Sequence, residues 1–340
     1  MQTADTTIII PTRTIDFLLK ECIMKIRELY ETVKIVLIVD EFQENETFGF
    51  DKNVQFIKSE NRNMSAKRNL GVKNADTAFV AFIDSDAYPA ENWIETGTEF
   101  LSNNPDYVAV TGNQLIPQDD DFEKQCLRLV RFCPLFTYSK WSKIIDLNAS
   151  EQDCTEFVTS NLIMKTSDYL KIGGMDENIY LAEDNEFSKR LHNKGYKIRF
   201  LPKMRVYHHE AAYFPFMKKI FSMSFYYTIK NKQNLSAKDI NEKIRMFIPL
   251  IGTVFMFLLL LLTFIFRLNL FINLLLPLLI FVIFSVEAIR LGKNFSAKRT
   301  KSYFMFLWLF VSFCVFYLLG QISGILHIKG IRAENLYRHY

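Results

Sequence analysis

Residues 77–86 read Thr-Ala-Phe-Val-Ala-Phe-Ile-Asp-Ser-Asp, an apolar run that ends in two carboxylates separated by one residue. The run has the length and composition of a buried strand. Asp84 and Asp86 follow its end, where both side chains can lie beside one opening and hold a hard cation through oxygen ligands. An isolated Asp-Ser-Asp match more often only caps the following turn. A second acidic pair, Glu183-Asp184, occurs later in the chain, and the two pairs together indicate a metal-dependent transferase.

Short apolar or β-branched runs alternate with stretches of helical period in the first part of the chain. This alternation predicts an α/β domain built on a mostly parallel sheet. In such sheets the ligand crevice lies off the carboxyl ends of the strands, and the dipeptides Pro11-Thr12 and Asp40-Glu41 occupy two such ends. The expected strands are residues 6–10, 34–39, 54–57, 77–83 and 107–111, with the first helix over residues 15–30.

Several function classes are disfavoured by what the sequence lacks. It has no Gly-x-Gly-x-x-Gly motif after the first strand and no Gly-Lys-Ser/Thr phosphate loop, which argues against dehydrogenases and P-loop NTPases. The net charge of +4 comes from lysines and arginines that flank apolar segments, so no nucleic-acid partner is expected. Residues 118–121 form an acidic loop, for which we expect a solvated surface and not a second metal site.

The second part of the chain is membrane-like. The sequence is 49% hydrophobic, and these residues are unevenly distributed. Residues 247–266, 268–286 and 303–326 contain no charged residue and approach the length that spans hydrocarbon, so we predict about three transmembrane helices. The expected organisation is a soluble domain over residues 1–212, an interfacial amphipathic linker over 213–246, a transmembrane region over 247–326 and a basic tail over 327–340.

The distribution of charge predicts an orientation in the membrane. Lysines and arginines precede the first predicted span and separate the second from the third, which places both loops in the cytoplasm. The first apolar run lacks a basic leader and stops at Pro11, so no signal peptide is expected. We therefore expect an integral protein of a bacterial-type inner or plasma membrane, with its catalytic domain in the cytoplasm.

An ordered set of motifs over residues 1–212 resembles the family 2 glycosyltransferases, which have the GT-A fold. Each motif is weak alone, and their common order carries the resemblance. The matching segments are residues 8–12 (Ile-Ile-Ile-Pro-Thr), 39–41 (Val-Asp-Glu), 65–71 (Ser-Ala-Lys-Arg-Asn-Leu-Gly), 82–87 (Phe-Ile-Asp-Ser-Asp-Ala), 173–177 (Gly-Gly-Met-Asp-Glu), 183–184 (Glu-Asp) and 206–208 (Val-Tyr-His).

The resemblance implies a Rossmann-like GT-A catalytic domain that binds a nucleotide-sugar with a divalent metal, Mg²⁺ or Mn²⁺. Asp86 is the expected direct ligand, Asp84 would hold the ribose or a metal-bound water, and His208 would complete the metal shell. Glu41 departs from the family's usual aspartate, which leaves the base of the nucleotide open. The expected donor site consists of Pro11, Thr12, Asp40, Glu41, Arg68, Asp84, Ser85 and Asp86.

The same resemblance assigns roles to the second acidic pair. Asp184 is the expected catalytic base of an inverting transfer, taking a proton from the acceptor hydroxyl, and Glu183 supports its geometry. Both carboxylates are also suited simply to begin a helix, where the dipole favours negative charge. Ser160 and Asn161 resemble a region that lines the acceptor site.

These expectations converge on a hexosyltransferase that acts at a membrane in cell-surface glycan or polysaccharide assembly. Tethering to lipid favours a lipid-linked saccharide as acceptor, because the reaction is then confined to the surface layer. The chain lacks the Gln-x-x-Arg-Trp motif that processive synthases carry after the acid pair, so a single transfer is expected. Two alternatives are a polyprenyl-phosphate glycosyltransferase and an inactive membrane scaffold that retains the fold.

Overall fold

The chain divides into two compact units in a computed structural model. The first consists of Met1–Asp120 and Phe132–His209, and the second of Asp121–Arg131 and Glu210–Tyr340. The structure describes residues 5–43, 49–133, 143–146, 148–233, 270–293 and 298–326.

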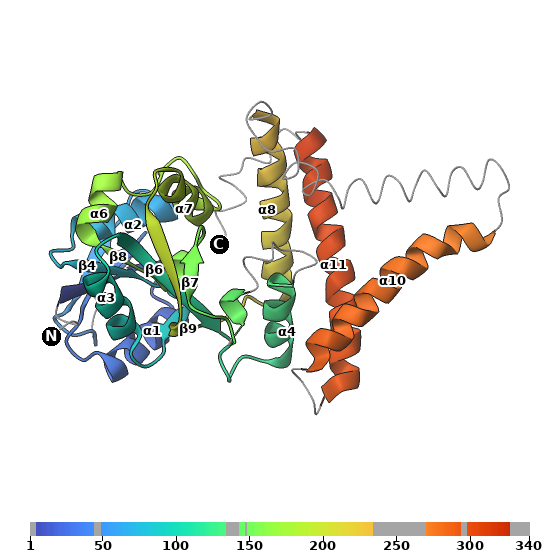
Figure 1. Ribbon diagram of the computed structural model, residues 1–340, viewed down its shortest axis with the longest axis horizontal. Helices are drawn as coiled ribbons and strands as arrows, with labels where there is room; N and C mark the ends of the chain where they lie inside the picture. Colours follow the sequence, from blue (N-terminus) through green and yellow to red (C-terminus); the bar gives the residue numbers. More distant parts are fainter. Residues whose placement is uncertain are drawn as a thin grey trace. The chain divides into compact units, whose positions relative to one another are not determined.

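The first unit is built on a nine-stranded sheet whose first half is parallel (Figure 1). It contains β1 (Thr6–Pro11), β2 (Lys34–Val39), β3 (Val54–Lys58) and β4 (Phe79–Phe82), in the order β3-β2-β1-β4. All three pairings between them are parallel, as the alternation of strands and helices predicts. Nearly continuous apolar runs suit these strands because both faces of the sheet are covered.

Beyond β4 the sheet is mixed, and the expectation of a mostly parallel sheet is too simple there. β8 (Leu162–Lys165) is antiparallel to both β4 and β6 (Tyr107–Leu115). β9 (Lys197–His208) is parallel to β6, while β5 (Ala87–Pro89) and β7 (Gln152–Cys154) pair with it antiparallel. The antiparallel β5–β9 ladder brings the end of β9 back to the turn that follows β4.

Helices cover both faces of the sheet (Figure 1). Residues of α1 (Phe17–Leu29) and α3 (Trp93–Asn103) join the hydrophobic cluster of one face. Residues of α2 (Met64–Lys73), α6 (Thr166–Ile172) and α7 (Glu183–Asn193) join that of the other. Because side chains alternate along a strand, Ile8 and Ile10 of β1 belong to the first cluster and Ile9 to the second.

The second unit is helical. It contains α4 (Phe122–Arg131), α8 (Tyr213–Gln233), α10 (Leu270–Gly292) and α11 (Arg299–Leu326). α8 packs along α11, and the Ser224 hydroxyl donates a hydrogen bond to the Tyr317 carbonyl at 2.6 Å. Gly320 and Gly324 allow this approach, because a Cβ atom at either position would collide with α8.

The last predicted span falls in a helix that could cross a membrane. Residues Thr300–Leu326 of α11 are long and apolar enough by length and composition, and no other helix meets that test in the part of the chain that the structure describes. Large apolar side chains are exposed along it. These include Phe304, Trp308, Val311, Val315 and Leu319.

The other membrane predictions have different outcomes. Residues 268–286 overlap α10, whereas the predicted span 247–266 and the basic tail 327–340 lie outside the described residues. The segment over residues 213–246 was expected to be interfacial, and α8 forms its first part. Phe216 and Phe225 of α8 are 1% exposed, whereas Phe214 is 77% exposed, and the interfacial role stays a prediction.

Candidate functional site

Asp84, Asp86 and His208 converge at the carboxyl end of β4. One ligand atom from each lies within 4.8 Å of the others. His208 Nε2 is 3.7 Å from Asp84 Oδ2 and 3.6 Å from Asp86 Oδ1. His208 Nδ1 lies 2.8 Å from the His209 carbonyl oxygen, which can only accept a hydrogen bond. The proton of a neutral imidazole therefore resides on Nδ1, and Nε2 presents its lone pair to the two carboxylates.

Local pairing of β5 and β9 produces this convergence. The chain turns sharply after β4, with the Ala87 amide donating to the Asp84 carbonyl at 3.1 Å. Ala87 then stands opposite His208 in the antiparallel ladder, and the His209 amide donates to the Asp86 carbonyl at 2.9 Å. The register thus fixes the histidine beside both aspartates.

Arg68 joins the two acidic motifs. Its Nη2 lies 2.9 Å from Asp84 Oδ1, and its Nη1 lies 2.8 Å from Glu183 Oε1. The guanidinium is buried, and these partners raise the pKa of Arg68 even though burial alone would lower it. Arg68 was expected to contact the donor, and the structure shows its fork engaged by two carboxylates.

The charges around Asp84 keep it ionised. Burial alone would raise the pKa of Asp84, but His208 when its ring is protonated, together with the Arg68 guanidinium, holds that pKa well below its ordinary value. Asp84 is therefore an anion over the whole physiological pH range, as a metal ligand must be.

Asp184 behaves in the opposite way. Burial, followed by the neighbouring Glu183 carboxylate, raises the pKa of Asp184 to about 7, and a hydrogen bond from the Asn185 amide only partly offsets this. A carboxylate with a pKa near neutrality is suited to accept a proton during catalysis. The two acidic motifs thus differ, because the pKa of Asp84 is lowered and that of Asp184 is raised.

The backbone before the acid pair is strained. Ala182, at the start of α7, has a φ angle of 59°, in the left-handed region that a residue with a Cβ atom seldom adopts. Its side chain cannot cap the helix. The conformation places Glu183 and Asp184 in the first turn of α7, where the helix dipole favours their negative charge.

The side chains of Asn69 in α2 and of Asn63 at its N-cap hold the segment that leads to the acid pair. Asn69 Oδ1 accepts hydrogen bonds from the Tyr169 hydroxyl at 2.6 Å and the Met175 amide at 2.9 Å. Gly174 has a φ angle of +67°, and a Cβ atom there would lie 2.5 Å from that oxygen. Asn63 Nδ2 donates to the carbonyls of Glu177 and Ile179 at 2.8 and 2.9 Å. The motifs at residues 65–71 and 173–177 therefore support each other directly.

A buried lysine organises the expected nucleoside side of the site. Lys67 is fully buried, and its Nζ lies 2.5 Å from both Asp40 Oδ1 and the Thr12 carbonyl oxygen. Burial lowers the pKa of Lys67, and the carboxylate of Asp40 opposes that effect. Sequence reasoning missed Lys67. Its position inside the 65–71 motif, next to Arg68, was the available signal.

The remaining donor-site predictions lie around the same strand ends. Pro11 is the buried last residue of β1, Glu41 is exposed after β2, and Ser85 is half-buried within the turn after β4. The structure brings these residues to one edge of the sheet. Their contacts with a donor remain a prediction.

The expected acceptor-site residues, Ser160 and Asn161, are buried, and their acceptor role stays a prediction. Asn161 is fully buried, and its amide accepts from Trp93 Nε1 at 2.8 Å and donates to the carbonyls of Asn113 and Met204, each at 2.9 Å. Ser160 is also buried and is hydrogen-bonded to Gln114. Both side chains belong to a polar network of the interior.

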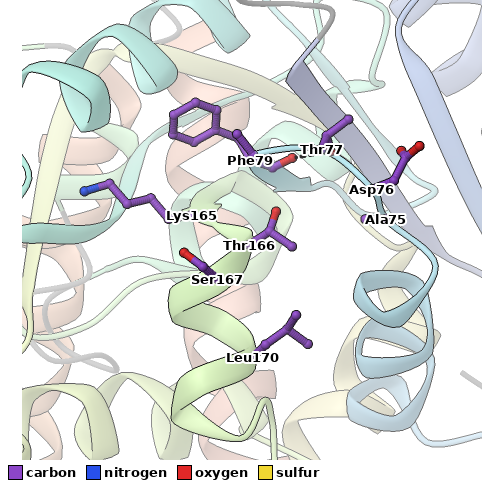
Figure 2. A pocket seen from close by; sticks show the side chains of 9 residues that line it. Ala75, Asp76, Thr77, Phe79, Lys165, Thr166, Ser167 and Leu170 are labelled. Carbon is purple, nitrogen blue, oxygen red and sulfur yellow. Dashed lines mark hydrogen bonds between the residues drawn. The ribbon is translucent and has the colours of Figure 1, made fainter.

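A pocket elsewhere on the first unit is not part of this arrangement. Figure 2 shows it at the amino end of β4, whereas Asp84 follows the carboxyl end of that strand. Its walls are Ala75, Asp76, Thr77, Ala78, Phe79, Lys165, Thr166, Ser167 and Leu170.

Removing the Arg68 bridge should destabilise the protein. In the metal-free chain, Arg68→Met leaves the half-buried Asp84 and Glu183 carboxylates without their guanidinium partner, so we expect the free energy of unfolding to fall by about 3 kcal/mol. Urea denaturation measures the change. Arg62→Met is the matched control, because its guanidinium is exposed and 4.0 Å from Asp40, and it should change stability by less than about 0.5 kcal/mol. Equal losses in the two variants would refute the bridging role.

Comparison with known proteins agrees with this geometry. The model of the family described as Glycosyl transferase family 2 matches residues 7–172, and that described as N-terminal domain of galactosyltransferase matches residues 140–212. A glucosyl-dolichyl phosphate glucuronosyltransferase of Haloferax volcanii is 31% identical over 160 residues, which cover 44% of this chain and 48% of the relative. A pre-mycofactocin glycosyltransferase of Mycobacterium tuberculosis is 24% identical over 217 residues, 60% of this chain and 42% of the relative. The chain spans about half the length of these curated relatives.

A solved structure shares the fold. The mannosyltransferase PcManGT from Pyrobaculum calidifontis, in complex with GDP-Man and Mn²⁺, aligns with a TM-score of 0.56 over 96% of this chain and 88% of its own. The sequence identity is 13%, so the likeness concerns the fold.

Proposed function

Residues 7–172 form a family 2 glycosyltransferase domain of the GT-A fold, and from this premise we propose that the protein moves one sugar from a nucleotide-diphosphate sugar to an acceptor hydroxyl at a membrane. One observation carries the proposal. Arg68 holds Asp84, a member of the metal-ligand cluster, and Glu183, the neighbour of the candidate base, at the two ends of one guanidinium. Donor-binding and proton-accepting groups thus lie within reach of one substrate.

The cluster of Asp84, Asp86 and His208 fits a divalent cation. Two carboxylates and a neutral imidazole nitrogen are suitable ligands for Mn²⁺, and the carboxylates also suit Mg²⁺. Such an ion supplies electrostatic stabilisation of the leaving diphosphate. The fold relative PcManGT was solved with GDP-Man and Mn²⁺, which supports a nucleotide-sugar and a metal here.

The other residues of the site bind and orient. Asp40 and the Thr12 carbonyl, fixed by Lys67, form a rigid polar wall suited to a nucleoside. Asp184 takes the proton of the acceptor hydroxyl as that oxygen attacks the anomeric carbon from the side opposite the diphosphate. Configuration at that carbon is then inverted. Glu183, held by Arg68, keeps Asp184 in place and raises its proton affinity.

We propose that the acceptor is carried by a lipid. A saccharide attached to a polyprenyl carrier is the most direct test substrate. The exposed apolar side chains of Thr300–Leu326 support this, because they suit the hydrocarbon layer of a membrane. The Haloferax relative supports it too, because its name refers to a glucosyl-dolichyl phosphate. We place the protein in a bacterial-type inner or plasma membrane with its catalytic domain in the cytoplasm, on the basis of the basic loops in the sequence.

A donor screen tests the proposed function. The full chain in detergent is mixed with radiolabelled UDP-, GDP- or dTDP-sugars, Mn²⁺ and a membrane lipid extract. We expect label from one donor to enter the organic phase only when metal is present. Label in an aqueous polymer would contradict the lipid acceptor, and failure of every donor to bind, with or without Mn²⁺, would support the inactive scaffold.

Defined acceptors separate the two enzymatic alternatives. The protein is offered bare polyprenyl phosphate or a polyprenyl phosphate that already carries one sugar. Transfer to the glycosylated lipid supports a hydroxyl acceptor. Transfer to the bare phosphate alone identifies a polyprenyl-phosphate glycosyltransferase, for which Asp184 has less to do because the attacking oxygen is already anionic.

A further inference from the structure

His209, the neighbour of His208, belongs to a separate cluster in the first unit. One ligand atom each from Glu21, Asp119 and His209 lies within 4.8 Å of the others. Glu21 comes from α1, Asp119 from the segment after β6, and His209 from the residue after β9. Three segments distant in sequence therefore bring two carboxylates and an imidazole together.

The hydrogen bond on the other side of the ring fixes its tautomer. His209 Nδ1 lies 2.9 Å from Asp120 Oδ1, and both side chains are buried. The carboxylate accepts the Nδ1 proton, so a neutral ring has its lone pair on Nε2. A carboxylate that orients a histidine in this way is the usual outer partner of a metal-binding imidazole.

The inner side of the ring lacks a hydrogen-bond partner. His209 is 8% exposed, and within the described residues its Nε2 makes no hydrogen bond. The Glu21 carboxylate faces that nitrogen, with Oε2 at 3.4 Å. Two lone-pair donors thus point at each other across a gap, and Asp119 adds a third from the solvent side. Only a proton or a cation relieves that arrangement.

We propose that Glu21, Asp119 and His209 bind a divalent transition-metal ion, in a site separate from the Asp84, Asp86 and His208 cluster. One imidazole nitrogen with two carboxylate oxygens suits Zn²⁺ or Mn²⁺ better than Mg²⁺ or Ca²⁺, which prefer oxygen alone. Asp119 is exposed, so the ion has a path from solvent.

The surroundings are acidic, since Asp120 adds a third carboxylate on the other side of the His209 ring. The Tyr88 ring lies 5.9 Å from the His209 ring. A bound cation would offset this charge and fasten α1 and the loop after β6 to the end of β9, on the residue whose carbonyl orients His208.

The proposal revises the prediction for residues 118–121. A solvated acidic surface was expected, and Asp119 is indeed exposed. Asp120, however, is 6% exposed and bonded to His209. The loop is thus anchored to the histidine and not wholly solvated.

Metal stoichiometry tests the proposal without any sugar donor. The full chain is loaded with Zn²⁺ or Mn²⁺, freed of excess metal, and analysed by mass spectrometry of the element and by titration calorimetry. We expect two ions per wild-type chain. Asp119→Asn should weaken binding at one site at least tenfold and leave the other unchanged, because Asp119 is exposed and its replacement leaves the fold intact.

Two further variants make the result decisive. Glu28→Gln removes a carboxylate from an exposed position of the same helix α1 and should retain two ions. Asp86→Asn combined with Asp119→Asn should lose both. A single ion that both the wild-type chain and Asp119→Asn retain, or the same two affinities in the two proteins, would overturn the second site. Because no donor is present, this outcome is independent of whether the chain transfers sugar.

Discussion

Replacing Asp184 with asparagine is expected to lower kcat for sugar transfer about a thousandfold, because the amide cannot take a proton from the acceptor hydroxyl. Asparagine has nearly the same shape, so binding of the donor should persist, with a Kd within about threefold of wild type. Radiolabel transfer measures kcat, and calorimetric titration with the donor measures Kd.

A matched variant isolates the charge at position 184. Glu186 lies in the same first turn of α7 and pairs with Arg190 at 2.8 Å, so Glu186→Gln removes an equal charge from the same helix end. Its kcat should remain within about twofold of wild type, since the group has no part in proton transfer. If Asp184→Asn also retains most of its activity, Asp184 is not the base, and a phosphate acceptor becomes the better explanation.

The raised pKa of Asp184 gives this prediction a second signature, in stability. The folded state holds the Asp184 proton more tightly than the unfolded state, whose aspartate titrates near 4. Stability is therefore lost as pH rises toward the folded pKa of about 7. Metal-free Asp184→Asn should accordingly have a higher Tm than wild type at pH 8, and the difference should vanish below about pH 4. If Asp184→Asn instead lowers Tm at pH 8, the buried charge of Asp184 does not destabilise the folded protein.

The parts of the site that could be predicted from the sequence are those set by local structure. The apolar run before Asp84 forms β4, and the parallel order of the first four strands places Thr12, Asp40 and Asp84 at one edge of the sheet. Thr12 and Asp40 directly follow their strands, and Asp84 lies two residues after the end of β4. The positions of the strand ends could be predicted without knowing any contact between residues distant in the chain.

The sequence did not reveal the burial of polar residues whose partners are remote in the chain. Asn161 sits in a Thr-Ser-Asn sequence typical of a surface, yet its amide bonds to Trp93 and Met204 inside the core. Lys67 in a helix normally faces solvent, and only the position of Asp40 explains its burial. Burial of a polar side chain depends on tertiary partners, which neither periodicity nor propensity contains.

The antiparallel pairings in the second half of the sheet could not be predicted for the same reason, because they depend on contacts distant in the chain. β8 is a short apolar run whose composition does not distinguish a parallel from an antiparallel strand. Its direction follows from how the intervening chain returns to β4 and β6. The consequence matters for function, because this half of the sheet carries β9 and hence His208 to the aspartates.

Asp86→Asn is expected to nearly abolish metal-dependent transfer while leaving the fold intact. Asp86 differs from Asp84 in its surroundings. Its side chain is 42% exposed and lies 3.6 Å from His208 Nε2, whereas Asp84 also pairs with Arg68. Loss of one of three ligands should raise the Mn²⁺ concentration for half-maximal activity about a hundredfold, and kcat at ordinary Mn²⁺ should fall by about a thousandfold.

Comparison of Asp86→Asn with Asp84→Asn distinguishes a role in metal binding from a role in stabilising the fold. Asp84→Asn also breaks the ion pair with Arg68, so it should lower Tm as well as activity, whereas Asp86→Asn should keep the wild-type Tm in metal-free buffer. Excess Mn²⁺ should restore part of the activity of Asp86→Asn, because mass action can refill a weakened site. Asp76→Asn, which removes an exposed carboxylate paired with Lys34, is the control and should keep the wild-type Mn²⁺ requirement. An unchanged Mn²⁺ requirement in Asp86→Asn would exclude Asp86 as a ligand and leave the cluster without its most accessible carboxylate.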